Sequence, residues 1–377
     1  MEKESIPRCM STQHPDNANV PFFCKADVLE GKNEVREAQF AYADLGCDEQ
    51  MWDAEGKEAY SSVIRSLLEK DQGFFKNHLL GKDNRLTVRV PNPEHERVEM
   101  KVILEVLENI PRSHDTAKKF YESLKNGKKY NGQSPVFEII LPMTTSADEL
   151  QRIYHYYKEN IGGRGERKAY DIKVKEWLGE THPKEIRVIP LIEEKEHMLN
   201  SHKIVENFIK DKDWDYQRVF LARSDPALNY GLIPAVLINK VALKRLDELQ
   251  EKTGVDIYPI LGVGSAPFRG NFSPDTVRNT MNEYPSVQTF TIQSAFKYDH
   301  SKEDVKEAVA YIRSKKSGSA QKVNEDKCLD IIERVSKNYR EKIEKIAKNV
   351  NKISKFVPSR RSRKLHIGLF GYSRELD

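Results

Sequence analysis

The sequence predicts an α/β protein built on a (β/α)8 barrel of the TIM type with helical insertions. Short apolar runs, several rich in β-branched residues, recur along the 377 residues, and helix-like stretches separate many of them. Polar side chains suited to chemistry follow many different runs, whereas an open doubly wound sheet, the main alternative, would gather its site at one switch point. A barrel of this type takes about 250 residues, so the chain is long enough for one with insertions.

Eight apolar runs are predicted as the barrel strands, because each ends in polar or glycine-containing sequence. In chain order they are Glu49–Asp53, Leu86–Val90, Val136–Leu141, Ile186–Ile192, Arg218–Ala222, Asp256–Leu261, Val287–Ile292 and Leu365–Phe370. Between them, Pro234–Glu251 is typical of the predicted helices, since its valines and leucines fall near helical spacing.

Residues 302–363 form a charged, mostly helical excursion within the single barrel domain that we assign to residues 1–377. From Ile332 to Val357 apolar residues repeat at steps of three and four, which predicts one long amphipathic helix. A coiled-coil contact is the alternative, and a helix packed on the outside of the barrel is favoured.

The end of the chain carries a separate expectation. Few residues follow Leu365–Phe370, so an eighth strand there would lack the helix that covers it and would expose apolar surface. We therefore expect an incomplete barrel at the C-terminus, from a fragment or half of a split enzyme. Such a chain is expected to be poorly active or inactive until a C-terminal segment is supplied.

Composition limits the kinds of binding partner that we expect. The formal net charge is only +4, which does not predict a polyanionic partner. The short basic stretch Ser359–Lys364 has no interleaved aromatic residues, so nucleic acid is not expected. Neither a membrane-length apolar run nor a signal peptide is evident. The four cysteines are scattered without a C-x-x-C pair, which fits a reducing cytoplasm.

A lone histidine is the first candidate for chemistry. Cys9–Asn17 places His14 between small polar residues and a proline, before any apolar periodicity begins. Histidine has the unperturbed pKa closest to neutrality, which suits an acid or base. A solvated turn is the usual explanation of such a residue in isolation, and two later segments reverse that interpretation.

Those segments are Phe220–Gly231 and Gly262–Pro274. The second surrounds Arg269 with glycines, small residues and prolines; glycine lets a backbone approach an anion closely, and a guanidinium binds phosphate or carboxylate through a bidentate fork. With the His14 segment, they closely resemble the archaeal-type phosphoenolpyruvate carboxylases, and the likeness runs from residue 8 to the last residues.

The resemblance implies that phosphoenolpyruvate and bicarbonate become oxaloacetate and inorganic phosphate in the cytoplasm. The residue matching His14 would be the base, and the arginine matching Arg269 would hold the reactive intermediate. The family also implies a homo-oligomer, namely a tetramer. The chain departs from the related bacterial and plant carboxylases, which carry an arginine in place of Val263 and a lysine in place of Leu228.

Glu193 and Asp225 are the predicted metal ligands. Each follows a predicted strand, and neighbouring strands of a barrel end at the same rim. Two carboxylates with room for water and a substrate oxygen suit Mg²⁺ or Mn²⁺, while spacing alone leaves two unrelated surface carboxylates equally open. In the resembled family the matching carboxylates bind the catalytic divalent ion.

Further rim residues are assigned to the substrate. Arg89 lies at the end of one predicted strand and Arg223 just past another, and a salt bridge is the alternative for each. Asp53 and Glu55 lie on the same expected rim with no role assigned. The whole substrate-binding set is Arg89, Arg223, Gly264, Ser265, Gln293 and Lys297. The family places additional phosphate-binding arginines after the position where this chain stops.

Three other functions remain open. A different phosphoenolpyruvate or pyruvate barrel enzyme would share the metal carboxylates without needing His14 and Arg269 together. A binding or assembly subunit, inactive without a C-terminal partner, is an alternative of another class. A nucleic-acid protein rests only on the short basic stretch.

Overall fold

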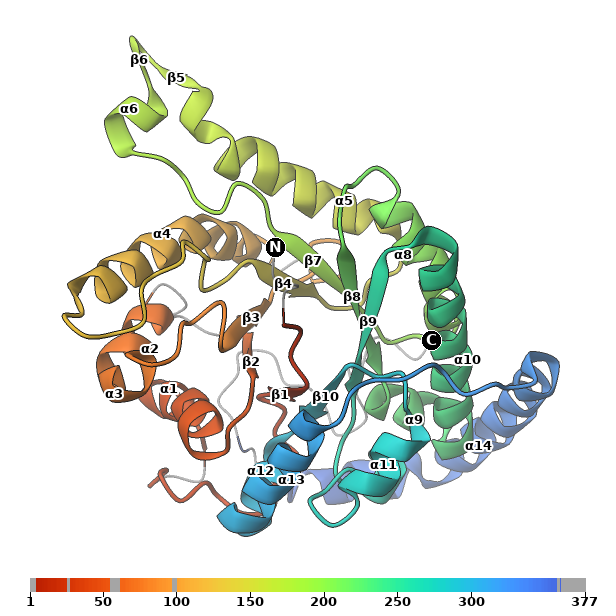
Figure 1. Cartoon of the computed structure of the whole chain (residues 1–377). Coiled ribbons are helices and arrows are strands. Elements are labelled where there is room, and N and C mark those ends of the chain that lie inside the picture. Colours follow the sequence, from red (N-terminus) through yellow and green to blue (C-terminus); the bar gives the residue numbers. More distant parts are fainter. Residues whose placement is uncertain (1–4, 26–27, 55–61, 97–99, 358–359, 361–377) are drawn as a thin grey trace.

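Eight parallel strands form a closed barrel in the computed structural model of the chain, which describes residues 5–25, 28–54, 62–96, 100–357 and 360. Their order around the barrel is β1-β10-β9-β8-β7-β4-β3-β2, and helices surround them (Figure 1). The strands are β1 (Cys9–Ser11), β2 (Glu49–Asp53), β3 (Arg85–Arg89), β4 (Glu138–Leu141), β7 (Arg187–Ile192), β8 (Tyr216–Ala222), β9 (Asp256–Gly262) and β10 (Thr289–Ile292).

The α-helices alternate with these strands, as the predicted fold requires. They are α1 (Lys32–Gln39), α2 (Val63–Lys70), α3 (Gln72–Phe75), α4 (Val102–Ser123), α5 (Ala147–Tyr156), α6 (Val174–Leu178), α7 (Lys195–Leu199), α8 (Ser201–Ile209), α9 (Ser224–Tyr230), α10 (Leu232–Thr253), α11 (Val277–Glu283), α12 (Ser294–Tyr298), α13 (Lys302–Ser314) and α14 (Glu325–Ser354). None of the helices in the described residues is long and apolar enough to cross a membrane.

The barrel prediction is confirmed, with one correction at its closure. Seven predicted runs are barrel strands whose ends lie within two residues of the prediction. The eighth place belongs to Cys9–Ser11, which pairs with β10 on one side and β2 on the other. The barrel therefore closes without Leu365–Phe370, a segment outside the described residues. Our strand assignment missed Cys9–Ser11 because three residues are too few to show a periodicity.

The long amphipathic helix is confirmed as α14, and its first half packs on the outside of the barrel against α10 and α9. Ile332 is fully buried, and the Tyr339 hydroxyl donates to the Leu228 carbonyl oxygen at 2.9 Å. A side chain at Gly231 would meet the Tyr339 ring at 3.0 Å, so close packing requires glycine there. Towards its end the helix carries exposed apolar residues, including Ile353.

An insertion projects from the barrel beyond α5 (Figure 1). It contains the antiparallel pair β5 (Lys168–Ala169) and β6 (Ile172–Lys173), followed by α6. Tyr170 and Trp177 are exposed on it. The charges of this arm are paired locally, since Glu166 accepts from both Lys173 and Lys175.

The barrel interior has an apolar middle. Side chains alternate between the inside and outside of a barrel strand, so every second residue faces inward. A separate buried cluster consists only of strand residues, which places it inside: Met10, Met51, Ile140, Ile189, Leu191, Phe220, Ala222 and Ile260. The larger core lies between the strands and the outer helices and contains Trp52, Val219 and Leu246, among others.

A charged layer lies below this apolar middle, at the amino ends of the strands. The guanidinium of Arg218 is fully buried and donates to Glu49 at 2.6 and 2.8 Å and to Glu138 at 2.9 Å. Arg85 donates to the same Glu138 oxygen at 2.7 Å, and Thr289 accepts from Arg218 at 3.3 Å. Burial alone would raise the pKa of Glu138, but the two arginines outweigh it and lower that pKa. Two cations and two anions thus link strands from opposite sides of the barrel.

We predict that Glu49→Gln strongly destabilises the fold. Removing this carboxylate leaves the buried Arg218 under-compensated, and breaking a buried ion pair in this way costs about 3–5 kcal/mol. Urea unfolding monitored by circular dichroism measures the loss. Glu94→Gln is the control, because its bridge to Arg152 is exposed and such pairs contribute about 0–1 kcal/mol. Equal stability of the two variants would contradict the importance of the charged layer.

Candidate active site

The carboxyl ends of the barrel strands place most predicted site residues at one mouth. Alternation puts Asp53 and Arg89 on the interior face, above Met51 and Thr87. Glu193 follows β7 directly, and Gln293 follows β10. His14 lies three residues beyond β1. The loop after β9 carries Arg269 on a short 3₁₀ helix, η4 (Pro267–Arg269).

His14 and Arg269 meet across this mouth although 255 residues separate them. Arg269 Nη2 lies 2.8 Å from His14 Nε2. A guanidinium only donates hydrogen bonds, so this contact requires Nε2 to accept, which is the neutral imidazole with its proton on Nδ1. The backbone holds the histidine firmly, because the His14 carbonyl oxygen accepts from Ser294 N at 3.2 Å and from Asp16 N at 3.1 Å.

The glycine-rich loop folds tightly around Arg269. Gly264 N donates to the Arg269 carbonyl oxygen, and Phe272 N donates to the Gly264 carbonyl oxygen, both at 3.1 Å. Gly270 has φ of 139° and Asn271 has φ of 52°, so the chain turns through conformations that most side chains avoid. A Cβ at Gly264 would lie 3.0 Å from both Arg269 Nε and Gln293 Oε1. Gly264 therefore lets the arginine and the glutamine approach one another.

Arg223 supports this loop from the neighbouring strand. It is buried, and it donates to the Tyr284 hydroxyl at 3.2 Å and to the Phe268 carbonyl oxygen at 3.3 Å. Ser265 Oγ donates to the Phe272 carbonyl oxygen at 3.0 Å. Among the buried polar atoms that have no hydrogen-bond partner in the described residues, two lie at this loop: Arg269 Nε and Gln293 Oε1. An unpaired donor beside an unpaired acceptor is typical of a place that a ligand or water completes.

Two buried ion pairs support the mouth. Arg89 binds Asp53 through two hydrogen bonds of 3.0 and 2.9 Å. The salt bridge that was the alternative for Arg89 is therefore present in this structure, and Asp53 is its partner. Lys297 is fully buried and donates to Glu37 at 2.8 Å, Ser11 at 2.9 Å and the Thr12 carbonyl oxygen at 2.8 Å. Lys297 thus braces the segment that leads to His14. Glu55 lies outside the described residues.

The two predicted metal ligands follow adjacent strands. The register Ile192↔Leu221 makes β7 and β8 neighbours. Glu193 directly follows β7, and Asp225, in the first turn of α9, follows β8, so both residues come after the ends of adjacent strands. Glu193 is buried and accepts a hydrogen bond from Met143 N at 3.0 Å. Within the described residues no group of three or more His, Cys, Asp or Glu gathers as a metal cage. Two carboxylates completed by water and substrate oxygens are a normal Mg²⁺ environment, so the residues present fit such an ion.

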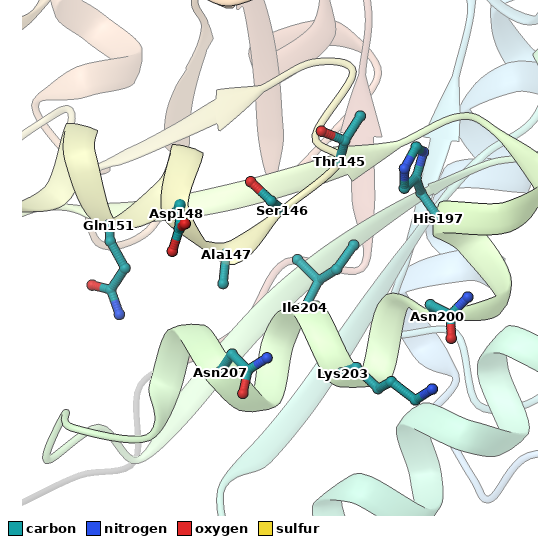
Figure 2. A pocket seen from close by; sticks show the side chains of 10 residues that line it. All are labelled: Thr145, Ser146, Ala147, Asp148, Gln151, His197, Asn200, Lys203, Ile204 and Asn207. Atoms are coloured by element: carbon teal, nitrogen blue, oxygen red, sulfur yellow. The ribbon is translucent and has the colours of Figure 1, made fainter.

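A cavity in the described part of the chain lies elsewhere, on the outside of the barrel. It measures about 390 Å³ and opens between the start of α5 and α8 (Figure 2). Its lining includes Ser146, His197 and Lys203 and contains none of the predicted site residues. The mouth, and not this cavity, is therefore the candidate active site.

Sequence reasoning assigned no role to several residues that build the mouth. Asp16, Glu37 and Tyr284 contact or support the predicted groups, yet only Asp16 had a visible signal, its place two residues after His14. Glu37 lies on a helix and Tyr284 after another, so nothing local in the sequence connects them to the mouth.

Fold and mouth together define a (β/α)8-barrel enzyme whose polar groups lie at the carboxyl ends of the strands. The family model described as phosphoenolpyruvate carboxylase matches residues 6–377, and the chain belongs to this family. It is 51% identical over 372 residues to the phosphoenolpyruvate carboxylase of Methanothermobacter thermautotrophicus and 50% identical over 373 residues to that of Methanospirillum hungatei. Each alignment covers 98% of this chain and 75% of the relative.

A solved structure of Haloferax volcanii malate synthase also aligns with the chain, with a TM-score of 0.47 and 11% identity. The alignment covers 86% of this chain and 80% of the malate synthase. The closed strand order, and not this alignment, establishes the fold.

We predict that Gly264→Ala lowers oxaloacetate formation without lowering the melting temperature appreciably. The new methyl group would displace Arg269 or Gln293, both of which are side chains that can move, and misplacing a reacting group by about 1 Å costs about a hundredfold in rate. A malate dehydrogenase-coupled assay and a thermal melt measure the two effects. Gly73→Ala is the control, since no atom lies within 4 Å of its Cβ position. Unchanged turnover would show that the close approach at Gly264 has no role.

Proposed function

We propose that this phosphoenolpyruvate carboxylase binds phosphoenolpyruvate and bicarbonate at the barrel mouth, with His14 as the base and Arg269 as the cation that holds the reactive intermediate. The contact of 2.8 Å between Arg269 and His14 is the observation that supports this most directly. It brings together the two residues that a carboxylase needs and that another phosphoenolpyruvate or pyruvate barrel enzyme would not need as a pair.

The proposed reaction runs in two steps. Bicarbonate oxygen attacks phosphorus, the bond from phosphorus to the enol oxygen breaks, and carboxyphosphate and the enolate of pyruvate result. His14 then takes the carboxyphosphate proton, carbon dioxide and phosphate separate, and the enolate carbon bonds to carbon dioxide to give oxaloacetate. The neutral imidazole that the Arg269 contact requires is the form able to accept that proton.

Arg269 would hold carboxyphosphate and shield it from water in this scheme. A guanidinium binds two oxygens of an anion at once, and excluding water prevents protonation of the enolate to pyruvate. Gly264, Ser265 and Gln293 would complete the anion site around it, with Arg89, Arg223 and Lys297 as the remaining cations of the substrate-binding set. Val263 is buried where the bacterial and plant enzymes have an arginine, so the loop offers Arg269 without that second cation.

Glu193 and Asp225 would hold the divalent ion, Mg²⁺ or Mn²⁺. When bound, such an ion stabilises the negative charge that develops on the enolate and the phosphate. Buried Glu193 is oriented by Met143 N, which leaves its position defined from the protein side.

Two broader features are also part of this proposal. Four free cysteines among the described residues support the cytoplasm as the compartment. The exposed apolar side chains of Tyr170, Trp177 and Leu178 on the projecting arm support a homo-oligomer, which we propose to be a tetramer.

We predict that His14→Asn abolishes carboxylation while it preserves phosphoenolpyruvate binding. Loss of a general base costs about a hundred- to ten-thousandfold, and the first step does not use it, so bicarbonate-dependent phosphate release is expected to continue with pyruvate as product. Coupled assays with malate dehydrogenase and lactate dehydrogenase measure the two products. His155→Asn is the matched control on an exposed helix face. Normal oxaloacetate output from His14→Asn would remove this residue from the mechanism.

We predict that Glu193→Gln and Asp225→Asn each weaken Mn²⁺ binding by about ten- to a hundredfold, because each exchanges an anionic oxygen for a neutral amide. Electron paramagnetic resonance of free and bound Mn²⁺ measures the affinity without requiring turnover. Asp213→Asn serves as the control, since that exposed carboxylate precedes β8 at the other end of the barrel. Wild-type affinity in both site variants would place the metal elsewhere.

A further inference from the structure

Asp16 lies between the His14 segment, the start of α12 and the glycine-rich loop. Its Oδ1 accepts a hydrogen bond from Ala295 N at 2.8 Å, and its own N–H donates to the His14 carbonyl oxygen at 3.1 Å. Since Ser294 N also donates to that carbonyl, the segment from His14 to Asp16 is attached to the start of α12. Asp16 therefore has a defined place two residues from the proposed base.

The carboxylate of Asp16 also interacts electrostatically with the glycine-rich loop. Burial raises the pKa of Asp16, and the N–H of Ala295, the charge of Arg269 and the N–H of Ser265 offset this only in part. Burial thus disfavours the charged form of this carboxylate more than these groups favour it. Two of the groups that favour its charge, Arg269 and Ser265, belong to the loop.

Unpaired polar atoms add a second, geometric observation. Asp16 Oδ2 is buried and has no hydrogen-bond partner among the described residues, and the same is true of Arg269 Nε. Arg269 contacts the His14 ring at 2.8 Å and Asp16 N is bonded to the His14 carbonyl oxygen, so both residues lie against the same histidine. The attraction between the carboxylate and the guanidinium disfavours movement of the arginine away from this place, because charges in a buried site are screened less than charges in water.

We propose that Asp16 is a positioning residue, which draws the glycine-rich loop inward through Arg269 and Ser265 and so holds Arg269 over His14. The inference rests on the proposed function of Arg269. Asp16 does not touch the reacting atoms in this scheme. Its carboxylate fixes where the guanidinium stands, and thereby whether carboxyphosphate is held until the second step.

A purely structural role is the alternative, in which Asp16 only caps the start of α12. Asp16→Asn separates the two roles, because the amide oxygen can still accept from Ala295 N while the charge is lost. A cap alone would survive this substitution. Attraction of the loop would not.

The test measures the loop directly and then the products. Limited trypsin digestion, followed by mass spectrometry, gives the cleavage rate of the Arg269–Gly270 bond in the folded full chain. In Asp16→Asn we expect this rate to rise about tenfold, the factor that corresponds to about 1.4 kcal/mol of lost attraction. The ratio of pyruvate to oxaloacetate is expected to rise with it, while the melting temperature changes little.

Asp299→Asn is the matched control. Asp299 accepts from Ala18 N at 2.9 Å and Asn19 N at 2.7 Å, so it anchors the same segment on its other side. Its loss should leave cleavage after Arg269 at the wild-type rate. If Asp16→Asn fails to fold, Asp16→Ser supplies the same comparison, because serine keeps a small capping acceptor without charge.

Each outcome decides the proposal. Wild-type cleavage and a wild-type product ratio in Asp16→Asn would overturn it, leaving the proposed function of Arg269 intact. In the background of Arg269→Gln, Asp16→Asn should not change the product ratio further, and an additive change would show that Asp16 acts independently. If Arg269→Gln itself makes oxaloacetate normally, the role of Arg269 fails instead.

Discussion

The ion pairs of Arg218 inside the barrel are the constraint on which the arrangement of the site depends. A barrel interior filled only by apolar side chains would tolerate small shifts of one strand past another. Arg218 reaches Glu49 on β2 and Glu138 on β4, so it connects β8 to strands that are not its neighbours. These ion pairs are directional and buried away from water, and each can form only at one register of the strands. The carboxyl ends of β2 and β8 then carry Asp53 and Arg223, and β7, which ends just before Glu193, lies between β8 and β4.

The strand that closes the barrel is also the strand that leads to His14, the proposed base. Cys9–Ser11 pairs with both β2 and β10, and His14 follows three residues later. Lys297 fixes the segment between β1 and His14, because it donates to the Ser11 hydroxyl and to the Thr12 carbonyl oxygen. Glu37 neutralises the charge of the lysine. Barrel closure and the position of His14 thus depend on the same few contacts. A change at Lys297 would therefore be expected to displace His14.

Much of this could be predicted from the sequence, and the reasons for the failures are physical. Runs such as Tyr216–Ala222 and Glu49–Asp53 are buried on both sides, so their composition identifies them as strands. Cys9–Ser11 escaped detection because its place depends on two partner strands and not on its own composition. The charged layer was invisible because Arg218 and Glu49 are 169 residues apart and read as ordinary strand ends.

Site residues show the same division. The motifs around His14 and Arg269 identified the two groups that the fold brings together, since their chemistry is local to each segment. Their mutual contact, and the Arg89–Asp53 pair, come from distant segments meeting at one rim, which spacing cannot show. Asp16 belongs to the same class, because its role depends on α12 and on the loop after β9 together.

The Arg269–His14 contact has a consequence for the order of events at the mouth. Nε2 of a neutral imidazole has a single lone pair, and Arg269 Nη2 occupies it at 2.8 Å. In the proposed mechanism, His14 would take the carboxyphosphate proton only after Nη2 turns from Nε2 toward the anion, while Asp16 keeps Arg269 at the mouth. An anion at the mouth supplies the reason for that movement, because a phosphate or carboxylate oxygen attracts a guanidinium more strongly than a neutral nitrogen does. In this proposal, the anion that turns Nη2 away from Nε2 would also free His14, so that the proposed base becomes available when carboxyphosphate is present.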